Sequence, residues 1–496
     1  MKIFLIGMMG SGKSTLGEMV SNILSIPFID IDNEIEKSEN MKIKDIFEKK
    51  GEKYFRVIES SYLEKLTQKN GPFVVSTGGG IILNSKNRYL LHNENTFYLK
   101  VSPNELKKRV HLENRPLLKN NRDNIIEIYQ QRKELYEEFE TIDITNLNEW
   151  ESVAKIIYKL NIEKDLEVSS SFQNVRIQSN ALKHIPDNNI IFLSEKVNQL
   201  YGSFFPQKKL ILPNGEKTKD ISYVLKAYEY LLENNVSRSD TLIGIGGGTI
   251  TDFSGFVGTT YKRGMNFSFY PTTLLGQIDA SIGGKNGIDF KRYKNVVGTI
   301  NLPNKVIIDP ISLLSLEDKL FLEGLIEGFK MCLIAGGDFY NFFKDNLELL
   351  LKRNLDKLSW FIKRSVEEKL RIVEKDFNDT GLRSSLNLGH TFGHAFEAIT
   401  GISHGLSVGW GLIKEVEYFK EKNYLQKNYY LEIIELLEKL LPENIRKIQT
   451  NSKEMIHYIA NDKKIGERKK IKMPILNSPG NVIIKEIDIS EFFEIL

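Results

Sequence analysis

Residues 3–15, IFLIGMMGSGKST, decide the fold of the first part of the chain. The apolar run 3–7 has the composition of a strand buried in a parallel sheet. A glycine-rich loop follows it at once, without the small-residue cleavage site of a signal peptide. The loop leads into residues 15–24, TLGEMVSNIL, which read as a helix. Strand, loop and helix in this order predict the first unit of a parallel α/β sheet.

The loop itself, Gly7-MMGS-Gly12-Lys13-Ser14, matches the phosphate-binding pattern G-x-x-x-x-G-K-[ST]. Backbone N–H groups of such a loop, and of the helix that follows it, can hold the phosphates of a nucleotide. Lys13 would neutralise the charge of the β- and γ-phosphates, and the hydroxyl of Ser14 would bind Mg²⁺. A structural turn with the same spacing is the alternative. The predicted nucleotide-binding residues are Gly10, Ser11, Gly12, Lys13, Ser14 and Thr15.

The alternation of strands and helices continues to about residue 160. Residues 27–32 (PFIDID), 73–80 (FVVSTGGG) and 96–101 (TFYLKV) read as strands, so we expect a parallel sheet with helices on both faces. Asp30 and Asp32 end the second strand, at the carboxyl edge where open α/β sheets bind ligands. Asp30 is suited to the magnesium shell, and Asp32 to orienting or deprotonating an acceptor hydroxyl.

Residues 1 to about 160 resemble shikimate kinases in the motifs GMMGSGKST, FIDID, GEKYFR, STGGG, NRPLL and QRKELYEE. The resemblance implies phosphorylation of shikimate by ATP with Mg²⁺. The residues that it implies for shikimate binding are Asp32, Arg56, Gly79 and Arg132, and those for catalysis are Lys13, Asp32 and Arg132.

The resemblance also places Arg115 in a lid over ATP. Read from the sequence alone, each of these arginines is more often a surface charge. Residues 144–148, ITNLN, lack the arginine that often contacts adenine in this family. Another small-metabolite kinase remains the alternative, although it would lack arginines placed to hold a ring carboxylate.

Length and composition describe an ordinary globular protein of two or three domains, with 496 residues, 41% hydrophobic and 27% charged. A net charge of +3 argues against a nucleic-acid partner bound by bulk electrostatics. The single cysteine, Cys332, excludes an internal disulfide and fits a reducing compartment. No apolar run reaches the ~18 residues of a membrane span. We therefore expect a cytoplasmic protein that acts on small molecules.

A second α/β pattern follows a polar segment, residues 161–175, that we interpret as a linker. After about residue 311 helical patterns dominate. The strands predicted between these points are 190–193, 209–213, 241–248, 267–273 and 306–309. The predicted domains are 1–160, a phosphate-binding-loop kinase; 176–310, an α/β nucleotide-binding lobe; and 311–496, a mostly helical lobe.

Three polar strand ends in the second α/β pattern point to another nucleotide site. Residues 246–252, GGGTITD, follow a strand and can admit a pyrophosphate, but a plain tight turn explains them equally well. Residues 213–219, PNGEKTK, and 271–273, PTT, follow two other strands, and their convergence on one edge favours a ligand crevice. Arg263, Lys285 and the pair 294–295 bring cationic and polar groups among glycines, which suits an acidic, phosphorylated substrate.

Three of the seven histidines lie within residues 390–404. His390 and His394 stand one helical turn apart, and a turn at residue 401 can bring His404 back toward them. With a carboxylate from elsewhere, such imidazoles suit zinc. Glu327, one turn before Lys330, is the candidate carboxylate. Histidines that only cap and hydrogen-bond, and a surface glutamate, are the alternatives.

From about residue 172 onward the chain resembles 3-dehydroquinate synthases in PNGEKTK, GGGTITDF, YKRG, PTTLLGQIDASIGGKNGID, KNVVG, EGFK, GLRSSLNLGHTFGHAFE, ISHG and NDKK. The resemblance implies conversion of 3-deoxy-D-arabino-heptulosonate 7-phosphate to 3-dehydroquinate and phosphate, with NAD and Zn²⁺ or Co²⁺. It also implies a homodimer formed through this half.

Several residues of this half receive roles from the resemblance. The implied metal ligands are Glu327, His390 and His404. NAD would be held by Glu216, Lys219, Gly247, Gly248, Asp252, Thr272, Thr273, Lys285 and Lys294. The substrate pocket would contain Arg263, Asp279, Lys285, Lys294, Asn295, Lys330, Lys369, Arg383 and His394, of which Lys285, Lys330, Lys369, Arg383 and His394 are the catalytic candidates.

Two positions depart from the family pattern. Asp379 stands where a glutamate is usual, and Ser194 stands where an aspartate or asparagine usually meets the adenosine ribose. The sequence as a whole predicts two enzymes of the route to chorismate on one chain. A small-metabolite kinase fused to a metal-dependent polyol dehydrogenase is the alternative. A non-catalytic nucleotide sensor is disfavoured because both sets of reactive residues are intact.

Overall fold

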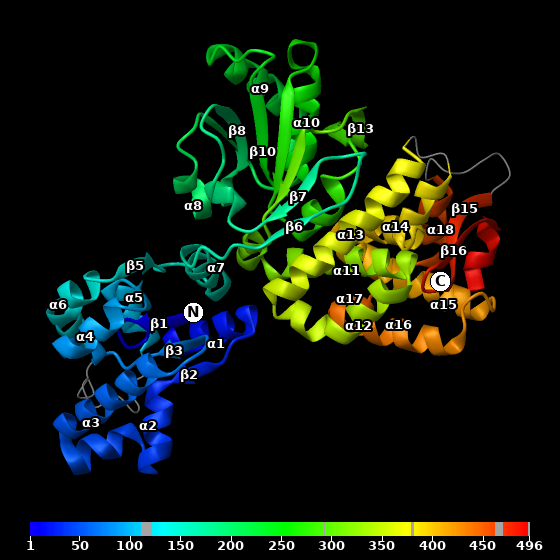
Figure 1. Ribbon diagram of the computed structural model, residues 1–496. Helices are drawn as coiled ribbons and strands as arrows, with labels where there is room; N and C mark the ends of the chain where they lie inside the picture. Colours follow the sequence, from blue (N-terminus) through cyan, green and yellow to red (C-terminus); the bar gives the residue numbers. More distant parts are fainter. Residues whose placement is uncertain (111–121, 292, 378–380, 462–469, 495–496) are drawn as a thin grey trace. The chain divides into compact units, whose positions relative to one another are not determined.

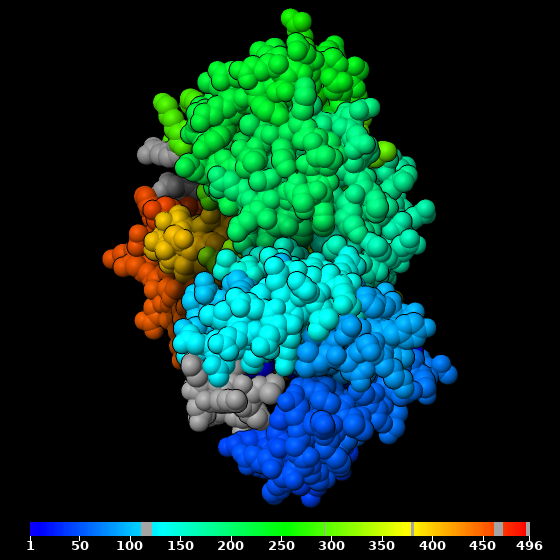
Figure 2. All heavy atoms as spheres, turned by 90° about the vertical axis from the view of Figure 1, so that its left-hand side faces the viewer, coloured from blue at the N-terminus to red at the C-terminus, as the bar shows by residue number. Residues whose placement is uncertain are grey.

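The computed structural model describes residues 1–110, 122–291, 293–377, 381–461 and 470–494 (Figure 1). The chain forms two compact units, Met1–Ile162 with Leu351–Asp356, and Glu163–Leu350 with Lys357–Leu496. In the space-filling view of Figure 2, residues 1–162 are blue to cyan and the α/β part of the second unit is green. None of the helices in the described ranges combines the length and the hydropathy needed to cross a bilayer.

The first unit contains a five-stranded parallel sheet in the order β2-β3-β1-β4-β5. Its strands are β1 (Lys2–Ile6), β2 (Phe28–Asp30), β3 (Phe73–Ser76), β4 (Asn95–Lys100) and β5 (Glu140–Asp143). The first four were predicted from their apolar runs. The edge strand β5, with the sequence ETID, was missed because it has one buried residue and two exposed charged ends.

The helices of the first unit follow the strands in alternation. They are α1 (Lys13–Leu24), α2 (Ile31–Glu39), α3 (Ile43–Gln68), α4 (Ser85–His92), α5 (Pro103–Arg109), α6 (Asn124–Glu137), α7 (Glu149–Lys159) and the 3₁₀ turn η1 (Ile81–Leu83). Helix α1 buries Leu16, Val20 and Ile23 at helical spacing. Gly17 lets α1 lie directly against β2, since a Cβ there would come within 2.6 Å of the Phe28 ring. This packing fixes the start of α1 above the sheet edge.

The second unit opens with a seven-stranded sheet in the order β6-β7-β14-β11-β10-β8-β9. All neighbours are parallel except β6 and β7. The strands are β6 (Asp165–Glu167), β7 (Val175–Gln178), β8 (Asn189–Ser194), β9 (Lys209–Leu212), β10 (Thr241–Gly246), β11 (Asn266–Pro271) and β14 (Lys305–Ile308). β6 and β7 were not predicted; β6 lies within residues 161–175, where no apolar run marks a strand.

An antiparallel hairpin, β12 (Lys285–Phe290) and β13 (Tyr293–Ile300), was also not predicted. Its residues in β13 are nearly all exposed, so they lack the apolar pattern of a buried strand. The helices that accompany the sheet are α8 (Glu195–Tyr201), α9 (Ile221–Glu233) and α10 (Gly248–Thr260). Short 3₁₀ or π turns are η3 (Ala181–Lys183), η4 (Gly202–Phe204), η5 (Glu216–Lys219), η6 (Tyr261–Arg263), η7 (Gly276–Ala280) and η8 (Pro310–Ser315).

The remainder of the second unit is mostly helical, as the sequence predicts (yellow-green to red in Figure 1). It contains α11 (Asp318–Ala335), α12 (Gly337–Leu351), α13 (Leu355–Lys375), η9 (Leu382–Asn387), α14 (His390–Thr400), α15 (His404–Glu421), α16 (Lys427–Leu440), α17 (Glu443–Arg446), α18 (Ser452–Asn461) and η10 (Ile489–Glu494). A C-terminal hairpin, β15 (Lys470–Ser478) and β16 (Asn481–Asp488), completes it.

Helices α14 and α15 approach each other unusually closely. A Cβ on Gly411 would meet the carbonyl oxygen of Gly389 at 2.1 Å and the backbone nitrogen of Gly393 at 2.5 Å. Only glycine at 411 permits this distance between the two backbones. The start of α14, which carries His390, is therefore held closely against α15, the helix that begins at His404.

Candidate active sites

The loop after β1 has the backbone conformation of a phosphate cradle. Gly10 and Gly12 adopt φ values of 81° and 83°, a left-handed region that glycine enters without strain. The side chain of Lys13 folds back over the loop, and its Nζ donates to the carbonyl oxygens of Gly7 at 2.9 Å and Met8 at 3.0 Å. The ammonium group therefore lies over the loop that the sequence assigns to phosphate.

Ser14 and Asp30 form a pair of oxygen donors beside this loop. The Ser14 hydroxyl donates to Asp30 Oδ2 at 2.6 Å, and it lies 3.2 Å from the Ser76 hydroxyl. Asp30 also accepts from the backbone N–H of Asn33 and so caps the start of α2. Hydroxyl and carboxylate oxygens are the donors that Mg²⁺ prefers. The two residues predicted for magnesium are thus adjacent.

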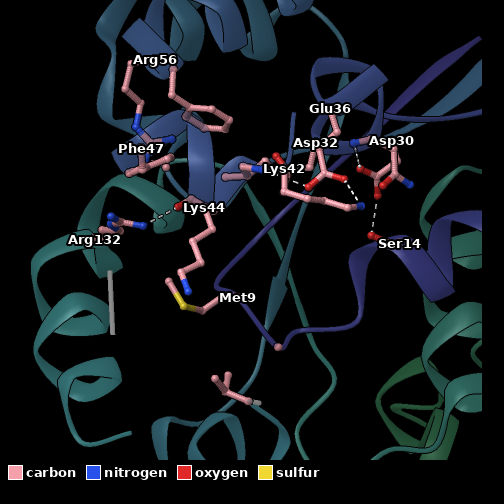
Figure 3. A pocket seen from close by; sticks show the side chains of 18 of the residues that line it. Met9, Ser14, Asp30, Asp32, Glu36, Lys42, Lys44, Phe47, Arg56 and Arg132 are labelled. Atoms are coloured by element: carbon pink, nitrogen blue, oxygen red, sulfur yellow. Dashed lines mark hydrogen bonds and ion pairs between the residues drawn. The ribbon is translucent and has the colours of Figure 1, made fainter. Parts of the chain in front are cut away.

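A pocket of about 480 Å³ opens beside the loop. Figure 3 shows that Arg56 and Arg132 lie on one side of this pocket and Ser14 and Asp30 on the other. Arg132 Nη1 donates to the Gly79 carbonyl oxygen at 2.8 Å. The Arg56 guanidinium lies against Gly80, where a Cβ would come within 2.3 Å of it. The sequence candidates that line this pocket are Gly10, Ser14, Asp30, Asp32, Arg56, Gly79 and Arg132.

Sequence reasoning missed Glu59, which lies behind the pocket. Its side chain is 1% exposed, and its Oε2 accepts from Arg56 Nη1 at 2.7 Å. Burial raises the pKa of Glu59 to about 7, even though Arg56 opposes the shift. The signal in the sequence was its position three residues after Arg56 on one helix face. Arg115, the lid candidate, lies outside the described residues.

In the second unit, the loops after β10 and β11 pack together at the carboxyl edge of the sheet. The backbone N–H of Thr272 donates to the Gly246 carbonyl oxygen at 2.8 Å. A Cβ on Gly247 would meet Thr273 Cγ2 at 3.0 Å, and one on Gly248 would meet the Ala280 Cβ at 2.8 Å. The predicted convergence of these polar strand ends is present.

Lys219 joins three of the predicted cofactor and substrate residues. Its Nζ is 2.6 Å from Asp252 Oδ2, 2.6 Å from Asn295 Oδ1 and 3.9 Å from Glu216 Oε1. Burial raises the pKa of Asp252 to about 6, while the neighbouring Lys219 limits the shift. The four side chains come from η5, α10 and β13, which are far apart in the sequence.

Two ion pairs join residues predicted for the metal and the substrate; both lysines and Glu327 are buried, and the Asp279 side chain is 34% exposed. Lys369 Nζ lies 2.7 Å from Asp279 Oδ1 and also donates to the Asp279 carbonyl oxygen, and Lys330 Nζ lies 2.6 Å from Glu327 Oε2. Burial lowers the pKa of Lys369 against the opposing effect of Asp279. Burial alone would raise the pKa of Asp279, but the positive charges of Lys369 and Lys330 outweigh this effect and lower the pKa. Arg383 is buried and donates to the Phe377 carbonyl oxygen at 3.0 Å.

Glu327, His390 and His404 meet at one point. Glu327 Oε1 lies 3.6 Å from His390 Nε2 and 3.4 Å from His404 Nε2. One ring nitrogen from each of His390, His394 and His404 falls within 4.8 Å of the others. Burial acts to raise the pKa of Glu327, but Lys330 and the two histidines lower it well below its usual value. The carboxylate is therefore an anion surrounded by nitrogen donors.

The two facing histidines have opposite pKa shifts. Burial, reinforced by Lys330, lowers the pKa of His390 to about 3. Burial alone would also lower the pKa of His404, but hydrogen bonds with Glu327 and Glu397 outweigh this effect and raise the pKa to about 10. Glu397 is a second residue that sequence reasoning missed. It lies seven residues after His390 on α14, a spacing that returns to the same helix face.

Some candidates lie away from these contacts. Arg263 is exposed in η6, and no described hydrogen bond or ion pair connects it to the other substrate candidates. Lys285 begins β12 with an exposed side chain. The Ser194 hydroxyl accepts from the Val197 backbone and caps α8. Asp379 lies outside the described residues.

Comparisons with known proteins cover nearly the whole chain. The shikimate kinase family model matches residues 9–161, and the N-terminal and C-terminal 3-dehydroquinate synthase models match 209–323 and 324–465. A bifunctional shikimate kinase/3-dehydroquinate synthase of Thermotoga maritima is 42% identical over 496 residues, which is 100% of both chains. The chain belongs to this bifunctional family. It has both activities, shikimate kinase and 3-dehydroquinate synthase, and acts in the shikimate pathway.

Members of the separate synthase family are also similar. The 3-dehydroquinate synthase of Sulfolobus acidocaldarius is 34% identical over 324 residues, 60% of this chain and 91% of that protein. Two solved structures share the fold of the second unit. The 2-epi-5-epi-valiolone synthase of Streptomyces hygroscopicus, solved with NAD⁺ and Zn²⁺, is 20% identical and covers 66% of this chain and 97% of its own, with a TM-score of 0.59. A 2-deoxy-scyllo-inosose synthase with NAD⁺ and Co²⁺ is 21% identical and covers 67% and 98%, with a TM-score of 0.59.

Proposed function

We propose that residues 1–160 phosphorylate shikimate with ATP and Mg²⁺ in the pocket beside the β1 loop. Ser14 and Asp30 fit a magnesium ion because their oxygens already lie 2.6 Å apart. Magnesium would neutralise charge on the transferring phosphate. The loop residues Gly10, Ser11, Gly12, Lys13, Ser14 and Thr15 would hold the nucleotide, with Arg115 as part of a lid.

Shikimate would occupy the other side of the same pocket. Arg56 and Arg132 present two cations for its carboxylate, and the backbone of Gly79 can approach the ring closely. Asp32 would orient the acceptor hydroxyl or take its proton. Phosphoryl transfer depends mainly on such positioning, together with charge neutralisation and exclusion of water.

We further propose that Glu327, His390 and His404 hold one divalent metal ion, zinc or cobalt, within a lobe that spans residues 311–496. The fit is good, because one carboxylate oxygen has two imidazole nitrogens within 3.6 Å. Two nitrogens and one oxygen are a usual ligand set for catalytic zinc. The metal would make the alcohol of the substrate more acidic. This three-residue cluster is the observation that carries the proposal for the synthase half.

NAD would bind to the α/β lobe, residues 176–310, at the edge where the loops after β10 and β11 meet. NAD supplies a hydride acceptor that is restored within each turnover, so the conversion of the heptulosonate phosphate to 3-dehydroquinate has no net redox change. The residues proposed for NAD are Glu216, Lys219, Gly247, Gly248, Asp252, Thr272, Thr273, Lys285 and Lys294. The Lys219–Asp252 contact at 2.6 Å supports placing these two residues in one NAD site.

The acidic substrate would lie among the buried cations. Lys330, Lys369 and Arg383 are suited to its carboxylate or phosphate. His394 is the candidate for moving a proton, because a nitrogen of its ring lies within 4.8 Å of the other two imidazoles. Arg263, Asp279, Lys285, Lys294 and Asn295 complete the proposed pocket. A homodimer through this half is supported by the family resemblance alone, and sedimentation of the full chain tests it.

Two assays on the purified chain test the function. With the heptulosonate phosphate, Zn²⁺ and NAD⁺, we expect phosphate release without accumulation of NADH. Steady NADH production would instead indicate a polyol dehydrogenase. With ATP, Mg²⁺ and shikimate we expect ADP formation that depends on shikimate; ADP formation with gluconate in its place would contradict the kinase assignment.

A further inference from the structure

Glu397 links a proposed metal ligand to the α/β lobe. It lies on α14, and its Oε2 is 3.0 Å from His404 Nδ1. Its Oε1 accepts from Lys294 Nζ of β13 at 2.8 Å. The side chain of Glu397 is 21% exposed, so both contacts are partly shielded from water. None of the roles assigned above uses this residue.

The contact with Glu397 determines which nitrogen of His404 can face a metal ion. An ionised carboxylate only accepts hydrogen bonds, so Nδ1 of His404 must carry the proton. The lone pair of a neutral ring then belongs to Nε2, the atom that lies 3.4 Å from Glu327 Oε1. The partner of the second ring nitrogen commonly fixes both tautomer and ring orientation in metal sites.

His390 has the same arrangement with a different acceptor. Its Nδ1 lies 3.1 Å from the carbonyl oxygen of Leu388, and its Nε2 lies 3.6 Å from Glu327 Oε1. Both histidines therefore present Nε2 to one carboxylate and Nδ1 to an oxygen acceptor. The acceptor for His390 is backbone, whereas the acceptor for His404 is a side chain that a substitution can remove.

We propose that Glu397 is a positioning residue of the synthase site, holding the ring and tautomer of His404 for the metal while Lys294 holds Glu397. The inference rests on the proposed function, since it requires that Glu327, His390 and His404 bind a cation. It adds a connection between the metal ligands and the β12–β13 hairpin. Asn295 lies on the same hairpin and accepts a hydrogen bond from Lys219, one of the residues proposed for NAD.

The test measures zinc affinity of the full chain by competition with a chromogenic chelator. Removal of such an acceptor typically weakens metal binding by about 10- to 100-fold, and we expect this range for Glu397→Ala. Glu397→Gln should lose less, because its amide oxygen still accepts from Nδ1. The matched control is Glu432→Ala on α16, since Glu432 also bonds one lysine and a second donor, with distances of 3.2 Å to Lys344 Nζ and 2.7 Å to Tyr340 Oη. The control should keep the wild-type zinc affinity.

The visible spectrum of the Co²⁺-loaded chain gives a second readout, because its d–d bands report ligand geometry at the metal. We expect Glu397→Ala to change these bands and Glu432→Ala to leave them as in the wild type. Zinc affinity of Glu397→Ala within twofold of the wild type, with unchanged bands, would overturn the inference. A wild-type chain that binds no equivalent of zinc would instead overturn the proposed metal site itself, so the two failures are distinguishable.

Discussion

The buried carboxyl group of Glu59 makes the stability of the kinase unit depend on pH. Burial raises its pKa from the ordinary 4.5 to about 7 in the folded chain. As pH rises from about 4.5 to about 7, the unfolded chain loses this proton first, so the group makes folding progressively less favourable. A shift of this size corresponds to about 3 kcal/mol in total, of which about 2 kcal/mol develops between pH 5 and pH 7.5.

The perturbation that tests this reasoning is Glu59→Gln, which keeps the shape and removes the ionisation. Stability is measured by urea unfolding of the full chain at pH 5 and pH 7.5. Loss of kinase activity serves as the unfolding signal, so that the measurement reports on residues 1–162. The wild type should lose about 2 kcal/mol more than the variant over this interval.

The matched control is Glu52→Gln, because Glu52 bonds the same Arg56 at 3.0 Å but its side chain is 45% exposed. This control should keep the wild-type pH dependence. Equal pH dependence in the wild type and Glu59→Gln would refute the reasoning, since the buried carboxyl group would then not be the group that titrates.

Three further predictions concern the two activities. Lys13→Ala should reduce shikimate phosphorylation by at least about 100-fold and leave phosphate release from the heptulosonate phosphate unchanged, because the Lys13 ammonium lies over the β1 loop of the first unit. Loss of both activities would contradict separate sites. Gly80→Ala should lower the kinase kcat/KM for shikimate by about 10-fold or more, because a Cβ would come within 2.3 Å of the Arg56 guanidinium, whereas the φ of -107° at Gly80 suits any residue. Initial rates at varied shikimate measure it, and an unchanged kcat/KM would contradict the placement of Arg56. Dipicolinate with excess Mg²⁺ should abolish synthase activity alone, and added Zn²⁺ should restore it; a synthase that survives removal of zinc would contradict the metal site.

The parts of the fold that the sequence predicts are those with a strong local signal. Strands β1, β4, β8 and β10 are continuous apolar runs between turns, and the loop before α1 has a fixed glycine spacing. The edge strands β5 and β6 and the exposed β12–β13 hairpin carry no such run. Their pairing depends on neighbours that are distant in the sequence, so local patterns cannot reveal it.

The candidate sites divide in the same way. Glu327 and the histidines could be recognised because residue types that bind metals cluster at helical spacing and match known motifs. For Glu59 and Glu397 the sequence offered only a helical spacing from Arg56 and His390, which is a weak signal because a glutamate is ordinarily a surface residue. Their contacts with Arg56 and His404 in the structure are what give them a role.

The most direct test of the central claim is zinc titration of the metal-free chain, comparing the wild type with a His390→Ala/His404→Ala double variant. The wild type should bind one zinc ion per chain at this site, and the double variant none, while both retain shikimate phosphorylation. Undiminished zinc binding in the double variant would contradict the claim that these two imidazoles and Glu327 hold a common ion.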